Sequence, residues 1–474
     1  MSDIKRADVK QLWKVTFPLM ISFMSTFAML FVDRLFLSLY SKDALNAAAI
    51  SGTLSWSFIV AWMTLAALAE VFVAQYNGAN RKMELARPVW QMIWLAGASV
   101  IFFSLASQFL TGFIYSGAGE QLHRDYFSWL MLCGPFAVII SGISAFYIGR
   151  GHGKVIKWLS ILANLVNIVL DPILIFGVNG VIPSMGIKGA AIATFSGYLV
   201  QAIVITCLFL SKRNREKYGT NNYRFDFDLC KRCFKIGFPP ALFAGLEILA
   251  WAIFYTMMQW VSPEHIFVCS VCQSIEMLFL FYCFGLEKGV AAVAGNLIGA
   301  KMHDQIKVLV KSAFKLIVYF AITMTLITII YPDPLINLFL QQETAQSTNL
   351  VLTSAETLRY KGLIRISLVF VTLYLIFESI RWLYSGLLTA AGDTLYIMIS
   401  GVISVWLFLL VPCYFFIVVK GQSIIFAFVI WTVYSIIATL LNFLRFKNGA
   451  WKNKVVIEDE TAQEQSNDNP LSTE

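Results

Sequence analysis

Charged residues are scarce in this sequence. Asp, Glu, Lys and Arg make up only 14% of its 474 residues, and only four residues are His. A soluble chain carries about a quarter charged residues. Apolar residues instead account for 58% of the chain, and the mean hydropathy is +0.71. This composition excludes an ordinary water-soluble domain and predicts an integral membrane protein.

The sequence also lacks the motifs of common catalysts. It contains no Walker phosphate loop, no dinucleotide fingerprint and no recognisable nucleophile arrangement. Its eight Cys include the pairs Cys230–Cys233 and Cys269–Cys272, but no matching His or Asp completes a zinc site. We therefore expect no enzyme activity, no cofactor and no metal other than a transported Na⁺. Any transport would run on an ion gradient or downhill, because nothing in the chain hydrolyses ATP.

The sequence does have long runs with almost no charge, each long enough to cross a hydrocarbon core of about 30 Å. The first run is too long for a signal-peptide core, and no small-residue cleavage site follows it, so we expect it to be retained. Twelve such runs are Val15–Tyr40, Ala47–Val73, Val89–Ile114, Phe127–Ile148, Val155–Val178, Gly189–Leu210, Ile236–Val261, Phe267–Ile298, Ala313–Tyr331, Leu363–Ala390, Leu395–Val419 and Ile424–Phe446. The sequence thus predicts an all-α integral membrane protein with twelve transmembrane helices.

Lys and Arg are concentrated in alternate loops between these runs. The loop around Arg81 and Lys82 is rich in them, as is the stretch from Lys212 to Lys217, whereas the opposite set of loops is sparse. The positive-inside rule then places both termini in the cytoplasm, and an even number of helices agrees with this. The net charge of +8 is therefore a topology signal, and we expect no nucleic-acid partner.

An internal duplication relates the two halves of the chain. Gly78-Ala79 follows the second run and Gly299-Ala300 follows the eighth, and in each case a basic residue and Met come next. The same offset places Pro18 on Pro239, near the start of each half. Six spans per copy is an even number, so the two bundles should be related by a pseudo-two-fold axis along the membrane normal. Such a duplication is typical of transporters.

The duplication predicts four segments of the chain. Residues 1–210 form an N-terminal six-helix lobe, and residues 211–231 form a basic cytoplasmic linker. Residues 232–446 form the C-terminal six-helix lobe. Residues 447–474 form a tail that is acidic and polar toward its end, for which we expect disorder in the cytoplasm.

Polar groups inside the first six runs fall at one depth. A charged side chain within a span is costly and needs a partner or a purpose. Asp33 lies in the outer half of the first run, and Asn164, Asn167 and Asp171 form a stripe on one face of the fifth. Their oxygens are hard ligands of the kind that hold Na⁺, or a proton on one carboxylate. Alternatively, the Asn residues join helices by hydrogen bonds and Asp171 is a buried neutral acid.

Three further residues complete this predicted site. Tyr126 and Thr194 begin the fourth and sixth runs, which descend from the outer face, so their hydroxyls lie at a similar depth. Pro172 follows Asp171 and frees a backbone carbonyl one turn back. We therefore expect a cation or proton site in the first lobe.

The second lobe has its own acids. Glu247 and Glu378 lie near mid-depth in the seventh and tenth runs, and Glu276 adds an acid in the eighth. Arg381 follows Glu378 by three residues, so an ion pair within that helix is the alternative to a functional role for Glu378. The pair Glu247 and Glu378 is predicted to take part in ion coupling or substrate binding.

Several short motifs are spread over the twelve runs. They are Pro18 with Asp33, Gln75-x-x-Gly78-Ala79, Asn167-x-x-x-Asp171-Pro172-Ile173-Leu174-Ile175-Phe176-Gly177, Gly186-x-x-Gly189-Ala190-Ala191-Ile192-Ala193-Thr194, Gly237-Phe238-Pro239, Gly299-Ala300, Ser385-Gly386-Leu387-Leu388 and Gly392-Asp393-Thr394. Together they resemble the pattern of the multidrug and toxic compound extrusion (MATE) transporters of bacterial type, over roughly Val9 to Phe446. One departure is Arg150-Gly151-His152-Gly153, where the family often has an Asp after the second Gly.

The resemblance implies a fold and an activity. The fold is two six-helix bundles around a V-shaped cleft, and the activity is export of cationic amphipathic compounds in exchange for Na⁺ or H⁺. It implies a monomer in the bacterial inner membrane, with lipid and small organic cations as partners. The cation site it implies in the first lobe consists of Asp33, Tyr126, Asn167, Asp171 and Thr194. In one branch of the family, acids at the places of Glu247 and Glu378 contribute, the latter more often being Asp.

Helix bending is the expected means of coupling. Pro18, Pro172 and Pro239 each interrupt the hydrogen-bond ladder of a span, so we expect the helices to bend at these residues during transport.

Two other kinds of transporter remain as alternatives. A flippase for a lipid-linked precursor or polysaccharide of the same superfamily would line its cleft with basic residues. Here Arg34, Lys288 and Arg381 each have an acidic neighbour within three residues, which argues against an anionic substrate. A major facilitator transporter would need a Gly-x-x-x-Asp-Arg-x-Gly-Arg-Arg loop between the second and third runs, and this chain lacks it.

Overall fold

The computed structural model describes residues 7–115, 117, 120–346, 354–454 and 456–457. Within these residues, twelve helices are long and apolar enough to cross a membrane, as the sequence predicts. The end of the predicted acidic tail, residues 458–474, lies outside the described residues. The start of that segment completes a helix and forms a short 3₁₀ turn, Ala450–Asn453.

The first six spans fold as one group. They contain α1 (Val9–Tyr40), α2 (Lys42–Ala67), α3 (Ala69–Gly78), α4 (Ala86–Leu105), α5 (Thr111–Ile114), α6 (Gln121–Gly149), α7 (Gly153–Phe176) and α8 (Ile187–Phe209). The second span is formed by α2 and α3, which are separated at Leu68, and the third continues from α4 through a π-helical turn at Ala106–Leu110 into α5. We call this group the first lobe.

The last six spans form the second lobe. They contain α10 (Phe227–Val261), α11 (Pro263–Gly299), α12 (Asp304–Thr325), α14 (Ser354–Ala390), α15 (Thr394–Val405), α16 (Val411–Cys413) and α17 (Ile424–Asn448), with π-helical turns at Leu326–Ile330, Trp406–Leu410 and Tyr414–Val419. Two short helices were not foreseen. These are α9 (Lys212–Tyr218), inside the expected linker, and α13 (Asp333–Gln346), between the ninth and tenth spans.

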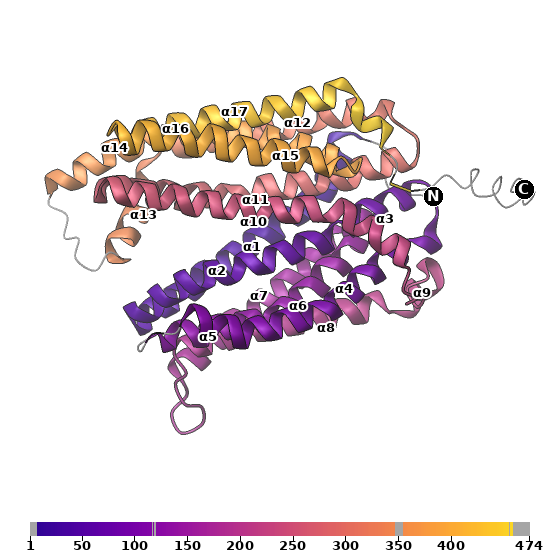
Figure 1. Cartoon of the computed structure of the whole chain (residues 1–474), viewed down its shortest axis with the longest axis horizontal. Helices are drawn as coiled ribbons and strands as arrows, with labels where there is room; N and C mark the ends of the chain where they lie inside the picture. The colour runs from indigo at the N-terminus through magenta and orange to yellow at the C-terminus, as the bar shows by residue number, and fades with distance from the viewer. Residues whose placement is uncertain (1–6, 116, 118–119, 347–353, 455, 458–474) are drawn as a thin grey trace, which may run out of the picture.

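The same pairs of spans pack together in both lobes. In the first lobe α1 packs on α7 and α2 on α6, and in the second α10 packs on α15 and α11 on α14. Figure 1 shows the two groups of ribbons converging at the end that carries both termini and lying further apart at the other end. We call these the termini end and the far end. The packing of equivalent spans against one another in both lobes confirms the predicted pseudo-two-fold arrangement.

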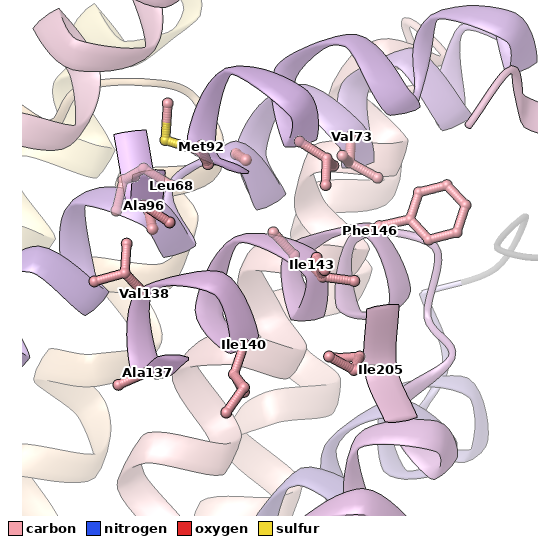
Figure 2. Close-up of a cluster of buried hydrophobic side chains, with 14 of the residues drawn as sticks. Leu68, Val73, Met92, Ala96, Ala137, Val138, Ile140, Ile143, Phe146 and Ile205 are labelled. Carbon is pink, nitrogen blue, oxygen red and sulfur yellow. The ribbon is translucent and has the colours of Figure 1, made fainter. Parts of the chain in front are cut away.

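Side-chain caps and apolar surface explain why these helices form where they do. The carboxylate of Asp8 accepts a hydrogen bond from the backbone N–H of Gln11 at 2.8 Å, and Asp226 accepts one from Leu229 at 3.0 Å. Both contacts satisfy donors that the first turn leaves free. Within the first lobe, the helices bury a contiguous apolar cluster that includes Phe146 (Figure 2). The second lobe buries a separate apolar cluster that includes Phe254 and Trp431, so each lobe has its own packed core.

The lobes meet along α1 and α11. Leu12, Val15 and Met20 of α1 belong to the same buried cluster as Leu286 and Val293 of α11. Glycines let these backbones approach closely. A Cβ on Gly285 would lie 2.4 Å from the Cγ of Met20, so a larger residue at that position would force the helices apart.

The duplicated Gly-Ala turns also pack symmetrically across the two lobes. A Cβ on Gly78 would lie 2.0 Å from the carbonyl oxygen of Asn296, and a Cβ on Gly299 would lie 2.0 Å from that of Gln75. The chain then turns through left-handed backbone at Asn80, with φ of 62°, and at the corresponding Lys301, with φ of 58°. Two equivalent contacts of this kind are what a two-fold relationship requires.

The three predicted helix-bending prolines lie inside helices that continue through them. Pro18 is within α1, Pro172 within α7 and Pro239 within α10. The interruption that the structure does place in the first lobe's second span is at Leu68, where α2 ends and α3 begins.

Candidate functional site

Four helices bring the predicted polar residues of the first lobe together. Asp33 comes from α1, Tyr126 from α6, Asn167 and Asp171 from α7, and Thr194 from α8. The Tyr126 hydroxyl donates to Asp33 Oδ2 at 3.3 Å. Asn167 Nδ2 donates to Asp171 Oδ1 at 3.4 Å and to Thr194 Oγ1 at 3.3 Å. We call these five residues the first-lobe site.

Hydrogen bonds between side chains and one glycine bring α1, α7 and α8 close enough to form this site. The hydroxyls of Ser22 and Ser160 are 2.6 Å apart and connect α1 to α7. Asn164 Nδ2 donates to Ser25 Oγ at 2.7 Å along the same contact. A Cβ on Gly197 would lie only 2.9 Å from the Ala163 carbonyl oxygen, so Gly197 allows α8 to lie against α7. Asn164 thus joins two helices, as the simpler interpretation of the stripe proposed.

Three buried oxygens of the first-lobe site lack a hydrogen-bond donor. Asp33 Oδ1, Asn167 Oδ1 and Asp171 Oδ2 receive no hydrogen bond from any residue that the structure describes. The three residues are 3%, 1% and 0% exposed, respectively. Buried polar atoms in native proteins are almost always satisfied. An array of unsatisfied acceptors therefore fits a positively charged ligand.

The chemistry of these donors favours a hard cation or a proton. Carboxylate and amide oxygens are typical ligands of such cations. Asp33 and Asp171 also lie close enough to repel one another electrostatically. Two acids in a low-dielectric site stay ionised together only when a cation offsets the repulsion, and otherwise one of them takes up a proton. Among the described residues, no group of three or more His, Cys, Asp or Glu side chains forms a metal site.

The second lobe contains a different arrangement. Arg381 and Glu378 form a forked ion pair on α14, with Nη2 to Oε2 at 2.6 Å and Nε to Oε1 at 2.9 Å. Trp382 Nε1 also donates to Glu378 Oε2 at 3.0 Å. The pair within one helix, proposed from spacing, is therefore present. The hydrogen bonds from Arg381 and Trp382 occupy both carboxylate oxygens of Glu378.

Glu247 on α10 lies beside this pair. Its Oε1 is 3.8 Å from Arg381 Nη2, and its side chain is 21% exposed, compared with 1% for Glu378. Glu276 on α11 is also buried and interacts with Tyr374 of α14. Arg381 thus neighbours Glu378 and Glu247, and Glu276 neighbours those two acids, so the cluster has one basic side chain for three carboxyl groups.

A charged contact between the lobes was missed from the sequence. Lys288 Nζ on α11 is 3.7 Å from Glu70 Oε2 on α3. Glu287 is adjacent to Lys288 in the sequence, and its Oε1 also accepts a hydrogen bond from Ser385 Oγ at 3.0 Å. The only signal for this contact was that Glu70 is a charged residue inside the second apolar run. Its partner is distant in sequence.

Polar contacts join the lobes at the termini end. Gln75 Nε2 donates to the Ala390 carbonyl at 2.8 Å, and Asn296 Nδ2 donates to the Gly149 carbonyl at 2.6 Å. Asn77 Nδ2 also donates to Asn296 Oδ1 at 2.6 Å. These contacts hold the bundles together at the termini end.

Comparisons with known proteins agree with this architecture. A family model described as MatE matches residues 18–173 and 240–415. The chain is 23% identical over 462 residues to a protein of Thermotoga maritima described as a probable multidrug resistance protein NorM, and the match covers 96% of each chain.

Solved structures share the fold. One is an outward-facing conformation of a multidrug resistance MATE family transporter of the MOP superfamily, with a TM-score of 0.81, 17% identity and coverage of 95% of this chain and 97% of that one. Another is a MOP superfamily transporter from Pyrococcus furiosus, with a TM-score of 0.80, 17% identity and coverage of 95% and 98%.

Proposed function

This chain belongs to the MatE family, and from that premise we propose that it is a secondary antiporter that exports cationic amphipathic compounds in exchange for Na⁺ or H⁺. Its relative in Thermotoga maritima is described as a probable multidrug resistance protein, which supports drug-like cargo. The twelve apolar helices make it a multi-pass membrane protein.

The observation that carries the ion-coupling half of this proposal is the set of three unsatisfied oxygens in the first-lobe site. Asp33, Asn167 and Asp171 each present one buried oxygen without a donor among the described residues. A sodium ion would draw its ligands from these oxygens, and a proton would reside on one of the two carboxylates. Either ligand would offset the repulsion between Asp33 and Asp171. Tyr126 and Thr194 hold the site together through their hydroxyl contacts.

The charge of the second lobe supports a cationic cargo. Arg381 pairs with Glu378 and lies 3.8 Å from Glu247, and Glu276 lies close enough to both of these acids to repel them. An excess of acid within a low-dielectric region attracts cations and repels anions. Glu247 is the acid for which we propose a direct role, because it is the most exposed of the three and Glu378 is fully engaged by Arg381.

The transport cycle that we propose opens the two ends of the molecule in turn. The polar contacts at the termini end close that side in this conformation, in which α3 and α11 pack together. We propose that this end is cytoplasmic and that the chain works as a monomer in the plasma membrane, the inner membrane of a bacterium. Binding of the coupling ion biases the equilibrium between the two states only by its different affinity for each.

Transport by purified protein tests the proposal. The full chain would be reconstituted in liposomes, and export of ethidium, a monovalent aromatic cation, would be followed by fluorescence under an imposed Na⁺ or H⁺ gradient. The proposal predicts ethidium movement that depends on one of the two gradients. Movement that is equal with and without both gradients would reject antiport.

A further inference from the structure

Glu70 occupies an unusual position in the fold. It is the only charged residue of α3, and its side chain is 4% exposed. Its Oε2 pairs with Lys288 of the other lobe at 3.7 Å, while its Oε1 has no hydrogen-bond donor among the described residues. A buried carboxylate in one lobe thus depends for its charge partner on a lysine in the other lobe.

Space adjoins this carboxylate at the junction of the lobes. A cavity of about 10 Å³ is lined by Glu70 and Ala67 from the first lobe and by Glu287, Lys288 and Thr389 from the second. That volume corresponds to about one water-sized group. Glu70, whose Oε1 lacks a donor among the described residues, therefore lines a cavity to which both lobes contribute.

Separating the lobes at this place affects the two charges differently. Lys288 would keep Glu287 as its neighbour on α11, since the two are adjacent in sequence. Glu70 would lose Lys288, and no basic residue of α3 could replace it. A carboxylate inside a membrane span needs a positively charged partner, and the cationic cargo can supply one.

We propose that Glu70 is a cargo-recognition residue that pairs with Lys288 when the lobes are closed at the termini end and with the positive charge of the cargo when they part there. Lys288 acts in this scheme as a built-in competitor of the cargo. This inference rests on the proposed function, because it presumes a cationic cargo. It concerns a carboxylate outside both the first-lobe site and the Glu247–Glu378–Arg381 cluster.

Binding of ethidium to the purified full chain, measured by fluorescence anisotropy, tests this role. Glu70→Gln should weaken binding by about tenfold, because it removes the charge that pairs with the cargo. Lys288→Met should strengthen binding by about threefold or more, because it removes the competitor. The double variant should resemble Glu70→Gln, since the competitor matters only when the acid is present.

The directions in which Glu70→Gln and Lys288→Met change the ethidium affinity show whether Glu70 recognises the cargo or only holds the lobes together. If the ion pair only held the lobes together, both single variants would break the same contact and would shift the affinity in the same direction, which overturns the proposal. Unchanged affinity in both variants overturns it as well. Glu264→Gln is the matched control, because Glu264 also lies on α11 and pairs with Arg359 at 2.7 Å, far from the lobe junction in sequence, and it should leave the affinity unchanged.

Folding of the variants is checked by size-exclusion chromatography. If Glu70→Gln does not fold, Lys288→Met alone keeps the proposal testable, because unchanged or weaker binding by that variant overturns it. Wild-type protein that neither binds ethidium nor moves it under an ion gradient would instead reject the proposed function. Wild-type protein that does both, with single variants that shift in the same direction, would reject only the role of Glu70.

Discussion

Gln75 and Asn296 hold equivalent places on the two sides of the pseudo-two-fold axis. The amide of Gln75 donates to the carbonyl of Ala390, the last residue of α14, and the amide of Asn296 donates to the carbonyl of Gly149, the last residue of α6. The backbones of the same two residues contact Gly299 and Gly78, respectively. One duplicated contact therefore closes the molecule at the termini end.

Gly78→Val should open this end. Its Cβ would lie 2.0 Å from the Asn296 carbonyl oxygen, and backbone atoms cannot yield as a flexible side chain does. We expect the equilibrium to shift toward the state that is open at the termini end, measured as faster labelling of a cysteine introduced at Ala79. Gly299→Val should act in the same way because its contact is the symmetric one. Gly97→Val, which meets no atom within 4 Å, should label like the parent, and equal labelling in all three would contradict the prediction.

Asp33→Asn and Asp171→Asn should each abolish gradient-driven export of ethidium from proteoliposomes. Both replacements keep the shape of the side chain but remove a charge from the first-lobe site, so a bound cation loses a ligand that balances it. Asp125→Asn is the control. Asp125 lies on the same helix as Tyr126 and contacts only the exposed Gln121 in the described hydrogen bonds, at 2.9 Å. Export by the Asp171 variant at the control rate would rule out a coupling role for that carboxylate.

Glu378→Gln should lower the stability of the fold more than it changes the binding of the cargo. Arg381 is 5% exposed, and without Glu378 its remaining acid is Glu247 at 3.8 Å. Leaving a buried charge uncompensated costs about 3–5 kcal/mol. We expect a clear fall in the thermal midpoint of the detergent-purified protein. Arg365→Met removes a pair with Asp333 whose side chains are 58% and 60% exposed, and its cost should be about 0–1 kcal/mol.

Pro18→Ala tests helix bending. Pro18 is buried within α1 and removes one hydrogen bond from that helix without ending it. Restoring the donor should stiffen α1, so we expect slower ethidium turnover together with an unchanged elution volume and thermal midpoint. Unchanged turnover would mean that bending at Pro18 is not part of the transport cycle.

Much of this architecture could be read from local sequence. The twelve spans follow from apolar runs, and the face shared by Asn167 and Asp171 follows from helical periodicity. The ion pair of Glu378 with Arg381 follows from the same spacing. Such features depend on residues that are near one another in the chain, so one sequence is enough to predict them.

Contacts between helices that are distant in the chain could not be predicted from the sequence. Glu70 and Lys288 are far apart in sequence, and the acid nearest to Lys288 along the chain is its neighbour Glu287. The helix α13 was also not predicted, because its segment is more polar than the spans and resembles a loop. The depth of the polar groups in the spans and the resemblance to a family both grouped Asp33 with Asp171, whereas their unsatisfied oxygens are seen only in the packed structure.

The competition between cations and cargo tests the central claim most directly. The dissociation constant of ethidium would be measured for the purified wild-type chain and for Asp171→Asn across a range of Na⁺ concentrations and of pH. The account predicts that one of the two cations weakens ethidium binding to the wild type and that the effect disappears in the variant. An equal dependence on that cation in both proteins would contradict the assignment of ion coupling to the first-lobe site.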